Sequence, residues 1–448
     1  MKVLLISANT LRVPYYIYPL GLDYVARAIA DRHNVMIVDS NITKGPERIT
    51  GTIRDFKPDA IGISLRNIDN TNLTDSKGYI DAYRKLVSAI RKCTDVPIIL
   101  GGSGFTLFPE QLMGLLGADY GIIGEGERLP RLLEALERGD DPAGLPGVIT
   151  GSMEGSFPPP LDEDFHRAPL QQQIARFYIE RGGMLNLQTK RGCPYRCIYC
   201  TYPHIEGCDL RPVHPEEVAD TAMDLERAGA NYLYITDSVF NADYDQSSRV
   251  ARAFMKAGLG IPWGAFLSPT KPPPGYYALL RDAGMTHAEF GTESLSPSML
   301  ASYRKPFSVD DVHEAHDAAV AAGLYVCHYL LLGGPGENRE TLEETLNNAA
   351  RLERTVIFFF CGIRIYPHTA LYDIALREGQ ISGNDDLIKP VFYQSREISG
   401  EEIIRITTER AAGRENWFIG TGSSLTTRLV ARLHRQGHTG PLWEMMIR

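Results

Sequence analysis

Short apolar runs alternate with segments of helical periodicity along the first 140 residues. The apolar runs lie at 3–7, 35–39, 60–65, 98–100 and 120–123. Helical periodicity follows at segments that include 20–31, 80–92 and 129–138. This alternation is typical of parallel strands joined by crossover helices. It predicts a five-stranded, doubly wound sheet of the Rossmann type, whose ligand binds beyond the carboxyl ends of the strands.

The alternation stops after residue 140 and resumes near Met184. Between them the chain is rich in Gly, Pro and acidic residues, including three prolines at 158–160, which favours an extended linker. Further strands are then predicted at 185–189, 232–236, 263–267, 287–291, 325–332 and 356–365. Six βα units in this length predict a partial (β/α)6 barrel, since a closed eight-unit barrel needs about 250 residues. The predicted divisions are 1–140 for the first domain, 141–183 for the linker, 184–383 for the barrel and 384–448 for a small, mostly helical cap.

Composition narrows the class of protein. The chain has 448 residues, 44% of them hydrophobic, which is enough for large globular cores. Its net charge of −9 argues against nucleic acid as the main partner. No apolar stretch approaches the roughly 20 residues of a membrane span. The first residues are expected to form a buried strand and not a signal peptide, so we expect a cytoplasmic protein.

Three of the seven cysteines fall within eight residues. Cys193, Cys197 and Cys200 form a Cys-x-x-x-Cys-x-x-Cys loop directly after the first barrel strand. Three thiolates on one loop suit a [4Fe–4S] cluster with one iron left open. A structural zinc site completed by His204 is the alternative. The scattered Cys208, Cys327 and Cys361 could hold a second cluster, although packing is the default for such thiols.

The cysteine loop, with aromatic Tyr199 before its last cysteine, resembles the radical S-adenosylmethionine superfamily. Three more segments are similar to those of the family: 235–241 after the second strand, 289–294 on the fourth and the glycine turn 332–337 after the fifth. The resemblance implies that S-adenosylmethionine binds the open iron and that one electron, from a donor such as flavodoxin or ferredoxin, cleaves it to a 5′-deoxyadenosyl radical. The contacts implied for S-adenosylmethionine are Tyr199, Asp237, Ser238, Glu293 and Gly334. Two of them have a simpler alternative, because Asp237 could cap the next helix and Glu293 could be a surface residue.

Two glycine turns in the first domain suggest a second cofactor. The segments 101–106 and 124–127 follow predicted strands, where glycines let a ligand approach the backbone and a helix N-terminus can meet a phosphate. These turns, with the segment 19–22, resemble the cobalamin-binding domains of cobalamin-dependent radical S-adenosylmethionine enzymes. The candidate cofactor contacts are Ser64, Arg66, Asn67, Gly101, Gly102, Thr106, Gly124, Glu125 and Gly126. The Asp-x-His-x-x-Gly loop of many cobalamin proteins is missing, so no protein histidine is expected on cobalt. Arg66 and Asn67, at the end of the third strand, are the predicted neighbours of its lower face, or else ordinary polar surface residues.

The resemblance implies an enzyme that acts on a small molecule. Methylation of an unactivated carbon is the favoured function, and a cyclisation or rearrangement without methyl transfer is the alternative. A non-catalytic corrinoid carrier is a third class, which the intact cysteine motif argues against. Lipids and natural-product intermediates are candidate substrates. Tyr366 and His368, after the sixth strand, are candidates for proton transfer or for a loop-capping role. The basic amphipathic segment 425–435 could contact a membrane, although a packed surface helix is the commoner explanation.

Overall fold

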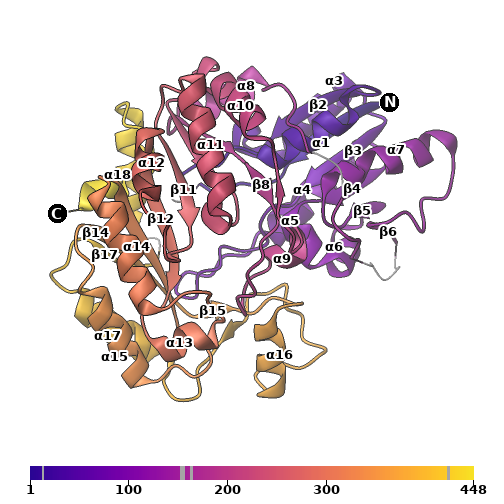
Figure 1. Ribbon diagram of the computed structural model, residues 1–448. Helices are drawn as coiled ribbons and strands as arrows, with labels where there is room; N and C mark the ends of the chain where they lie inside the picture. The colour runs from indigo at the N-terminus through magenta and orange to yellow at the C-terminus, as the bar shows by residue number, and fades with distance from the viewer. Residues whose placement is uncertain (13–14, 152–156, 162–164, 421–423, 448) are drawn as a thin grey trace.

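The computed structural model describes residues 1–12, 15–151, 157–161, 165–420 and 424–447 and consists of two α/β units (Figure 1). The N-terminal unit has a six-stranded sheet in the order β2-β1-β3-β4-β5-β6. Its strands are β1 (Lys2–Ser7), β2 (Asn34–Asp39), β3 (Ala60–Ser64), β4 (Ile98–Gly101), β5 (Tyr120–Ile122) and β6 (Val148–Thr150). The first five run parallel, as predicted, and their residues are apolar and buried because helices cover both faces.

Strand β6 was not predicted and lies in the segment assigned to the linker. It pairs antiparallel with β5 and adds a sixth strand at the edge of the sheet. Gly147, at φ +78°, permits the tight turn before it. The helices of this unit are α1 (Leu20–Ala30), α2 (Ser40–Thr43), α3 (Pro46–Phe56), α4 (Ile80–Arg91), α5 (Ser103–Leu107), α6 (Pro109–Leu116) and α7 (Leu129–Arg138), with the short η1 (Gly126–Arg128).

The second unit is a partial barrel of parallel strands in the order β17-β14-β13-β12-β11-β10-β7. Its strands are β7 (Met184–Leu187), β10 (Tyr232–Ile235), β11 (Trp263–Leu267), β12 (Met285–Glu293), β13 (Tyr325–Leu332), β14 (Thr355–Cys361) and β17 (Trp417–Ile419). Its outer helices are α10 (Pro215–Arg227), α11 (Tyr244–Ala257), α12 (Tyr276–Asp282), α14 (Val309–Ala321) and α15 (Arg339–Ala349). The predicted α/β class with a partial barrel is therefore confirmed.

The C-terminal region does more than cap the barrel. Strand β17 pairs in parallel with β14 and extends the six predicted strands to seven. The predicted strand 356–365 breaks at Gly362, at φ +89°, and continues as β15 (Ile363–Arg364), which pairs with β16 (Phe392–Tyr393). The remaining C-terminal elements are α16 (Ala370–Arg377), α17 (Gly400–Ala411), α18 (Ser424–Arg435) and η3 (Trp443–Met446).

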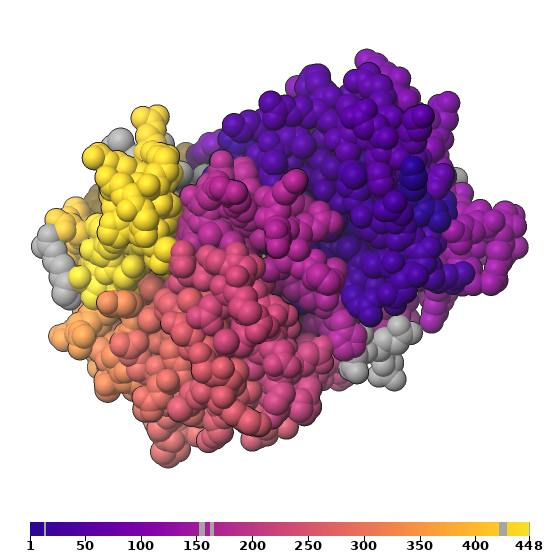
Figure 2. Space-filling model, turned by 90° about the horizontal axis from the view of Figure 1, so that it is seen from above, coloured from indigo at the N-terminus to yellow at the C-terminus, as the bar shows by residue number. Residues whose placement is uncertain are grey.

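Buried ion pairs fix the N-terminal unit against the rest of the chain. Asp23 of α1 pairs with Arg167 at 2.7 Å, and Asp69 pairs with Arg364 at 3.0 Å. In Figure 2 the N-terminal unit (indigo) abuts the barrel (magenta to orange), and the C-terminal segment (yellow) lies on the barrel's other side. Among the described helices, none is both long and apolar enough to cross a bilayer.

Candidate functional site

A cavity of about 310 Å³ lies between the two units. One wall consists of the carboxyl ends of β1, β3, β4 and β5 with the N-terminus of α1. The opposite wall belongs to the barrel and includes Asn186, Gln188, Arg191, Tyr202, Ile205, Glu206 and Thr236. Of the predicted cofactor contacts, those in the wall are Ser64, Arg66, Gly101, Gly102, Gly124, Glu125 and Gly126. The residues of the wall that the structure describes include no histidine.

Glycines give the cavity its depth. A Cβ on Gly102, which has φ +96°, would lie 3.0 Å from the carbonyl oxygen of Leu65, so this turn excludes a side chain. Gly21 of α1 and Gly124 face open space, with no atom within 4 Å of where a Cβ would be. A side chain at either position would fill the cavity. The site therefore fits a bulky cofactor that approaches the backbone closely.

The structure corrects the predicted placement of two residues. Thr106 is completely buried and does not line the cavity; its Oγ1 accepts a hydrogen bond of 3.0 Å from the Gly124 backbone N–H and so joins the two glycine turns. Asn67 also lies outside the wall, and its carbonyl oxygen accepts a hydrogen bond from Tyr83. Thr106 positions the glycine turn, whereas contact with a cofactor was expected.

Arg66 lines the cavity, and several tyrosine side chains lie near it. The tyrosines within electrostatic reach of its guanidinium are Tyr15, Tyr83, Tyr178 and Tyr202. Its side chain is exposed to the cavity, yet the protein around it excludes bulk water, and this desolvation lowers the pKa of Arg66. Arg66 is thus a cation at the end of β3 that lines the space between the two units, with four tyrosines within electrostatic reach.

The cysteine loop follows the short strand β8 (Lys190–Arg191) and depends on Gly192. That glycine has φ +88°, and a Cβ on it would meet the carbonyl oxygen of Asp209 at 2.0 Å. Cys193 is buried, and Cys197 and Cys200 are half-buried. Burial and the neighbouring sulfurs raise the pKa of Cys197 and raise that of Cys200 to about 12. Such thiols need a cation to bind as thiolates, which iron provides.

The spacing of the thiols bears on the kind of metal site. Among the described residues, no three His, Cys, Asp or Glu side chains are placed as ligands of one metal ion. In a cubane cluster each thiolate binds a different iron, so the three sulfurs surround a volume and need not meet at a point. The donor set of three sulfurs on one loop fits that arrangement.

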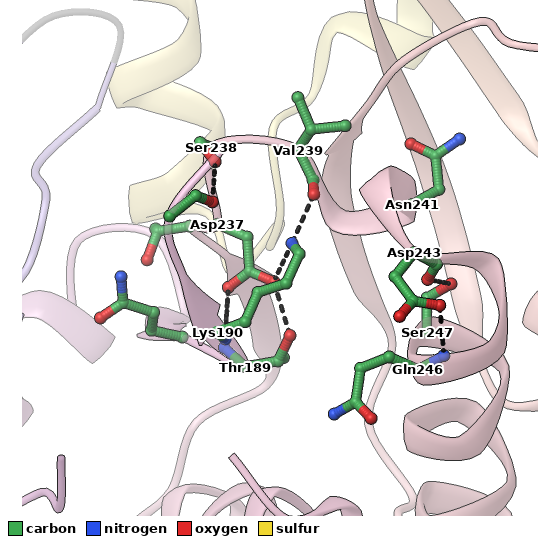
Figure 3. Close-up of polar contacts among 12 residues, drawn as sticks. Thr189, Lys190, Asp237, Ser238, Val239, Asn241, Asp243, Gln246 and Ser247 are labelled. Atoms are coloured by element: carbon green, nitrogen blue, oxygen red, sulfur yellow. Dashed lines mark hydrogen bonds and ion pairs between the residues drawn. The ribbon is translucent and has the colours of Figure 1, made fainter. Parts of the chain in front are cut away.

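The segment after β10 holds the cysteine loop in place (Figure 3). The Asp237 carboxylate accepts hydrogen bonds from the Thr189 backbone N–H at 2.7 Å and its hydroxyl at 2.5 Å, and it pairs with Lys190 Nζ at 3.0 Å. Lys190 also donates to the Val239 carbonyl oxygen, and the Ser238 hydroxyl donates to that of Gly192 at 3.1 Å. Thr189, Lys190 and Asp237 are buried, and Ser238 and Val239 are half-buried. Asp237 and Ser238 therefore fix the backbone from which the cysteines project.

Asp237 does not cap the next helix, so that alternative is wrong. The N-cap of α11 is Asp243, whose carboxylate accepts from the backbone N–H groups of Asp245 and Gln246 at 2.9 and 3.0 Å (Figure 3). Direct contact of Asp237 or Ser238 with S-adenosylmethionine stays a prediction.

We expect Asp237→Asn to lower the free energy of unfolding by about 3–5 kcal/mol, because it leaves the Lys190 ammonium buried without a counter-ion. The disturbed loop should also hold less iron after reconstitution. Chemical unfolding and iron analysis measure both effects. Asp243→Asn is the matched control, since asparagine caps a helix as well as aspartate does. Equal stability of the two variants would contradict the role given to Asp237.

Glu293 lies beside the cysteine loop in a strained conformation. It has φ +65°, which costs a non-glycine residue of the order of 1 kcal/mol or more. Its neighbours are anchored: Thr292 bonds His328 at 2.7 Å and Ser294 bonds Thr345 at 2.9 Å. The carboxylate then lies 3.6 Å from Lys305 Nζ.

Lys305 was not predicted. Its ammonium donates to the Tyr199 hydroxyl at 3.3 Å and lies within electrostatic reach of Cys197, so Glu293, Lys305 and Tyr199 form one polar group at the loop. No motif in the sequence marks it, because the lysine follows the short helix α13 (Pro297–Ser302) and only the fold brings it here.

The glycine turn after β13 reaches the same place through Tyr303. A Cβ on Gly334 would lie 2.2 Å from the Tyr303 ring, so glycine is required for this packing. Tyr303 in turn meets Tyr199 edge-on, with ring centroids 6.0 Å apart. Glu337 closes the turn by accepting from the Gly333 N–H at 2.6 Å, and burial raises its pKa to about 7.

The two candidates for proton transfer lie at the junction of the units, outside the cavity wall. Tyr366 packs against Phe108 and below the Arg364 guanidinium. His368 stacks on His204 with ring centroids 4.4 Å apart. Burial and the proximity of His368 lower the pKa of His204 to about 4, so His204 is neutral. A catalytic role of Tyr366 or His368 stays a prediction.

The other cysteines do not gather. Cys208 is exposed, whereas Cys327 and Cys361 are buried in different cores. The alternative of a second cluster on these three residues therefore finds no support in their placement.

A charge network that sequence reasoning missed joins the cavity to the cysteine loop. Glu125 accepts from Arg191 at 2.9 Å and from Arg211 at 2.8 Å, and Glu127 accepts from Arg191 at 2.6 Å. The Glu125 side chain, predicted as a cofactor contact, is thus engaged by arginines from the barrel. Desolvation alone would raise the pKa of Glu125, but the hydrogen bond from the Leu161 backbone N–H and the two arginines outweigh it and lower that pKa.

Comparison with known proteins agrees with this arrangement. The family model of the B12 binding domain matches residues 6–133, and that of the radical SAM superfamily matches residues 187–349. The chain is 23% identical over 444 residues to tryptophan 2-C-methyltransferase of Streptomyces laurentii, covering 82% of this chain and 73% of that protein. It is 24% identical over 325 residues to anaerobic magnesium-protoporphyrin IX monomethyl ester cyclase of Rubrivivax gelatinosus, covering 68% and 56%.

A solved structure shares the whole fold. The radical S-adenosylmethionine methyltransferase TsrM from Kitasatospora setae, with cobalamin and a [4Fe–4S] cluster bound, superposes with a TM-score of 0.87 at 20% identity over 99% of this chain and 97% of that one. The fold and site thus define a radical S-adenosylmethionine enzyme with a B12-binding domain. The chain belongs to the cobalamin-dependent radical S-adenosylmethionine family, whose cofactors are a [4Fe–4S] cluster, S-adenosylmethionine and cobalamin.

Proposed function

We propose that the protein is a methyltransferase that methylates an unactivated carbon of a small molecule. The observation that carries the proposal is a cavity between the carboxyl ends of the N-terminal sheet and the barrel segments that follow β7 and β10, with the cysteine loop joined to it through Arg191. When bound, cobalamin supplies the methyl group, and the cluster with S-adenosylmethionine supplies the radical. The names of the relatives favour methylation over the cyclisation that one of them carries out.

The chain's own residues hold and orient these groups. Gly21, Gly102 and Gly124 leave space that cobalamin would occupy, and Arg66 would lie beside it in a wall whose described residues include no histidine. Cys193, Cys197 and Cys200 bind the cluster. The Glu293 carboxylate, aimed at the loop by its strained backbone, is placed to receive the amine of S-adenosylmethionine.

The cellular context is part of the proposal. The relative from Streptomyces laurentii acts on tryptophan, which supports a small-molecule substrate here. Cleavage of S-adenosylmethionine needs an electron donor such as flavodoxin or ferredoxin. Free thiols and an exposed Cys208 suit the reducing cytoplasm. The α18 helix exposes Leu429 and Arg432 while His434 packs inward, so it is a surface helix, and membrane contact stays a prediction.

Methyl-labelled S-adenosylmethionine tests the proposal. During turnover, label should enter the product, and S-adenosylhomocysteine and 5′-deoxyadenosine should accumulate near one to one, because one S-adenosylmethionine gives the methyl group and another gives the radical. Arg66→Ala should slow methyl transfer more than formation of 5′-deoxyadenosine, since it leaves the cysteine loop unchanged. Turnover that yields 5′-deoxyadenosine with neither S-adenosylhomocysteine nor labelled product would establish rearrangement instead.

A further inference from the structure

The inner face of the barrel carries a row of aromatic rings on five strands. Tyr234 of β10 contacts Phe266 of β11, and Phe266 contacts Tyr329 of β13, with ring centroids 5.3 and 6.0 Å apart. Phe358 of β14 and Phe418 of β17 continue the row at 5.2 and 5.4 Å. Phe266 is 38% exposed although its strand neighbours Ala265 and Leu267 are buried on the outer face, so the row borders open space on its inner side.

Strand β12 places a carboxylate in this row where the other strands place rings. Glu289 is 2% exposed; one of its oxygens accepts from the Tyr329 hydroxyl at 2.6 Å and the other from Trp443 Nε1 at 3.0 Å. Burial raises the pKa of Glu289, and these donors oppose the rise. A carboxylate offers about four acceptor positions, so both oxygens keep capacity for a further donor.

A second polar group on the same face lacks a partner. Tyr234 is 3% exposed, and its hydroxyl lies near enough to Glu289 to lower the pKa of that carboxyl. It does not meet the geometry of a hydrogen bond, however, and has no partner among the residues that the structure describes. An unsatisfied buried hydroxyl costs about 1–3 kcal/mol, which a ligand would recover.

Tyr15 lies near both this face and Arg66 of the cavity wall. That residue comes from the N-terminal unit, packs against Tyr232 and Tyr234, and lies within electrostatic reach of both Glu289 and Arg66. The other titratable groups near Glu289 are Cys327, His287 and Glu444, of which only the histidine can carry positive charge. An anion would therefore meet a buried acid here, whereas a donor or cation would meet its complement.

We propose that this aromatic face is the substrate subsite and that it takes a flat, apolar or aromatic body bearing an N–H or ammonium group, held by Glu289 and the Tyr234 hydroxyl. The proposal rests on the proposed function and deepens it. The rings would stack on the flat body, and the Glu289 carboxylate would bind its donor group and so set its orientation on the face.

Binding of two probes of equal shape tests the subsite without turnover. The cluster- and cobalamin-loaded protein should bind 2-naphthylmethylamine at least about tenfold more tightly than 2-naphthoate by anaerobic calorimetry, since only the amine complements a buried carboxylate. Glu289→Gln should remove this preference, and Phe266→Ala should weaken both probes. Glu344→Gln, on the exposed side of α15, is the matched control and should change neither.

A second variant keeps the test decisive if Glu289→Gln fails to fold. Tyr234→Phe removes only the unpartnered hydroxyl, so it should leave the melting temperature unchanged or higher while weakening amine binding several-fold. Equal binding of both probes to the unaltered protein, an amine preference that survives Glu289→Gln, or amine binding that Tyr234→Phe does not weaken would overturn the subsite. Methyl transfer is measured separately, by the label that enters the product. The binding experiment can therefore refute the subsite without refuting the methyltransferase assignment, and the labelling experiment can refute that assignment without refuting the subsite.

Discussion

The Cys197→Ala variant is expected to retain only traces of iron after anaerobic reconstitution and to release no 5′-deoxyadenosine. The unaltered chain should hold about four irons and four sulfides, the stoichiometry of one cubane cluster. Two remaining thiols cannot hold that cluster in a loop whose cysteines otherwise have raised pKa values and stay protonated. Iron and sulfide analysis, with chromatography of the nucleoside products, measures both losses.

Cys93→Ala is the matched control for this variant. Its thiol is half-buried in the N-terminal unit and donates only to the Thr50 carbonyl oxygen, so the cluster should be unaffected. Cleavage of S-adenosylmethionine by Cys197→Ala would refute the assignment of the loop. About eight irons in the unaltered chain would instead show that the remaining cysteines bind a second cluster.

The second large effect is expected from Gly21→Leu, which should reduce bound cobalamin from about one per chain to less than about a tenth of that. Gly21 lines the cavity from the first turn of α1, and no atom lies within 4 Å of its Cβ position. Leucine favours a helix more than glycine does, so the fold should hold while the side chain occupies the cofactor's space. The absorption spectrum of the purified, cobalamin-loaded protein measures the loss.

Gly114→Leu provides the comparison, because Gly114 also lies in a helix and faces open space, but on the exposed surface of α6. It should bind cobalamin as the unaltered chain does. Full binding by Gly21→Leu would place the cofactor elsewhere. The spectrum should also show no histidine nitrogen on cobalt, since the described wall residues include none.

Features that depend on neighbours along the chain could be predicted from the amino-acid sequence. The cysteine spacing puts three thiols on one loop whatever surrounds it, and Gly102 and Gly192 have positive φ values that their local turns require. Alternation of apolar runs and helical periodicity likewise sufficed for the doubly wound sheet and the partial barrel, because parallel strands buried on both faces read as continuous apolar runs.

Contacts between side chains far apart in the sequence depend on the fold and could not be predicted. Asp237 and Lys190 are 47 positions apart and pair because β7 and β10 are neighbours in the sheet. Nothing in the sequence distinguishes Glu289 from the other acidic residues. In the fold it lies inside the barrel, where Trp443, 154 positions away, donates a hydrogen bond to it. The periodicity of apolar residues, 2 in strands and 3.6 in helices, indicates which face of an element is buried. It does not indicate which other element covers that face, so it cannot predict such pairs.

The same limit explains the two strands of the main sheets that were not predicted. The three-residue strands β6 and β17 are too short to show a period, and each exists because an edge of a neighbouring sheet offers unpaired N–H and C=O groups. Thr106 was misplaced for a related reason: its position after a glycine turn suggested a ligand contact, while the packing of α5 against β5 turned its hydroxyl toward Gly124. The residue types within a loop thus determine what the loop can bind. The packing of strands that are far apart in the sequence determines which side chains lie opposite the loop.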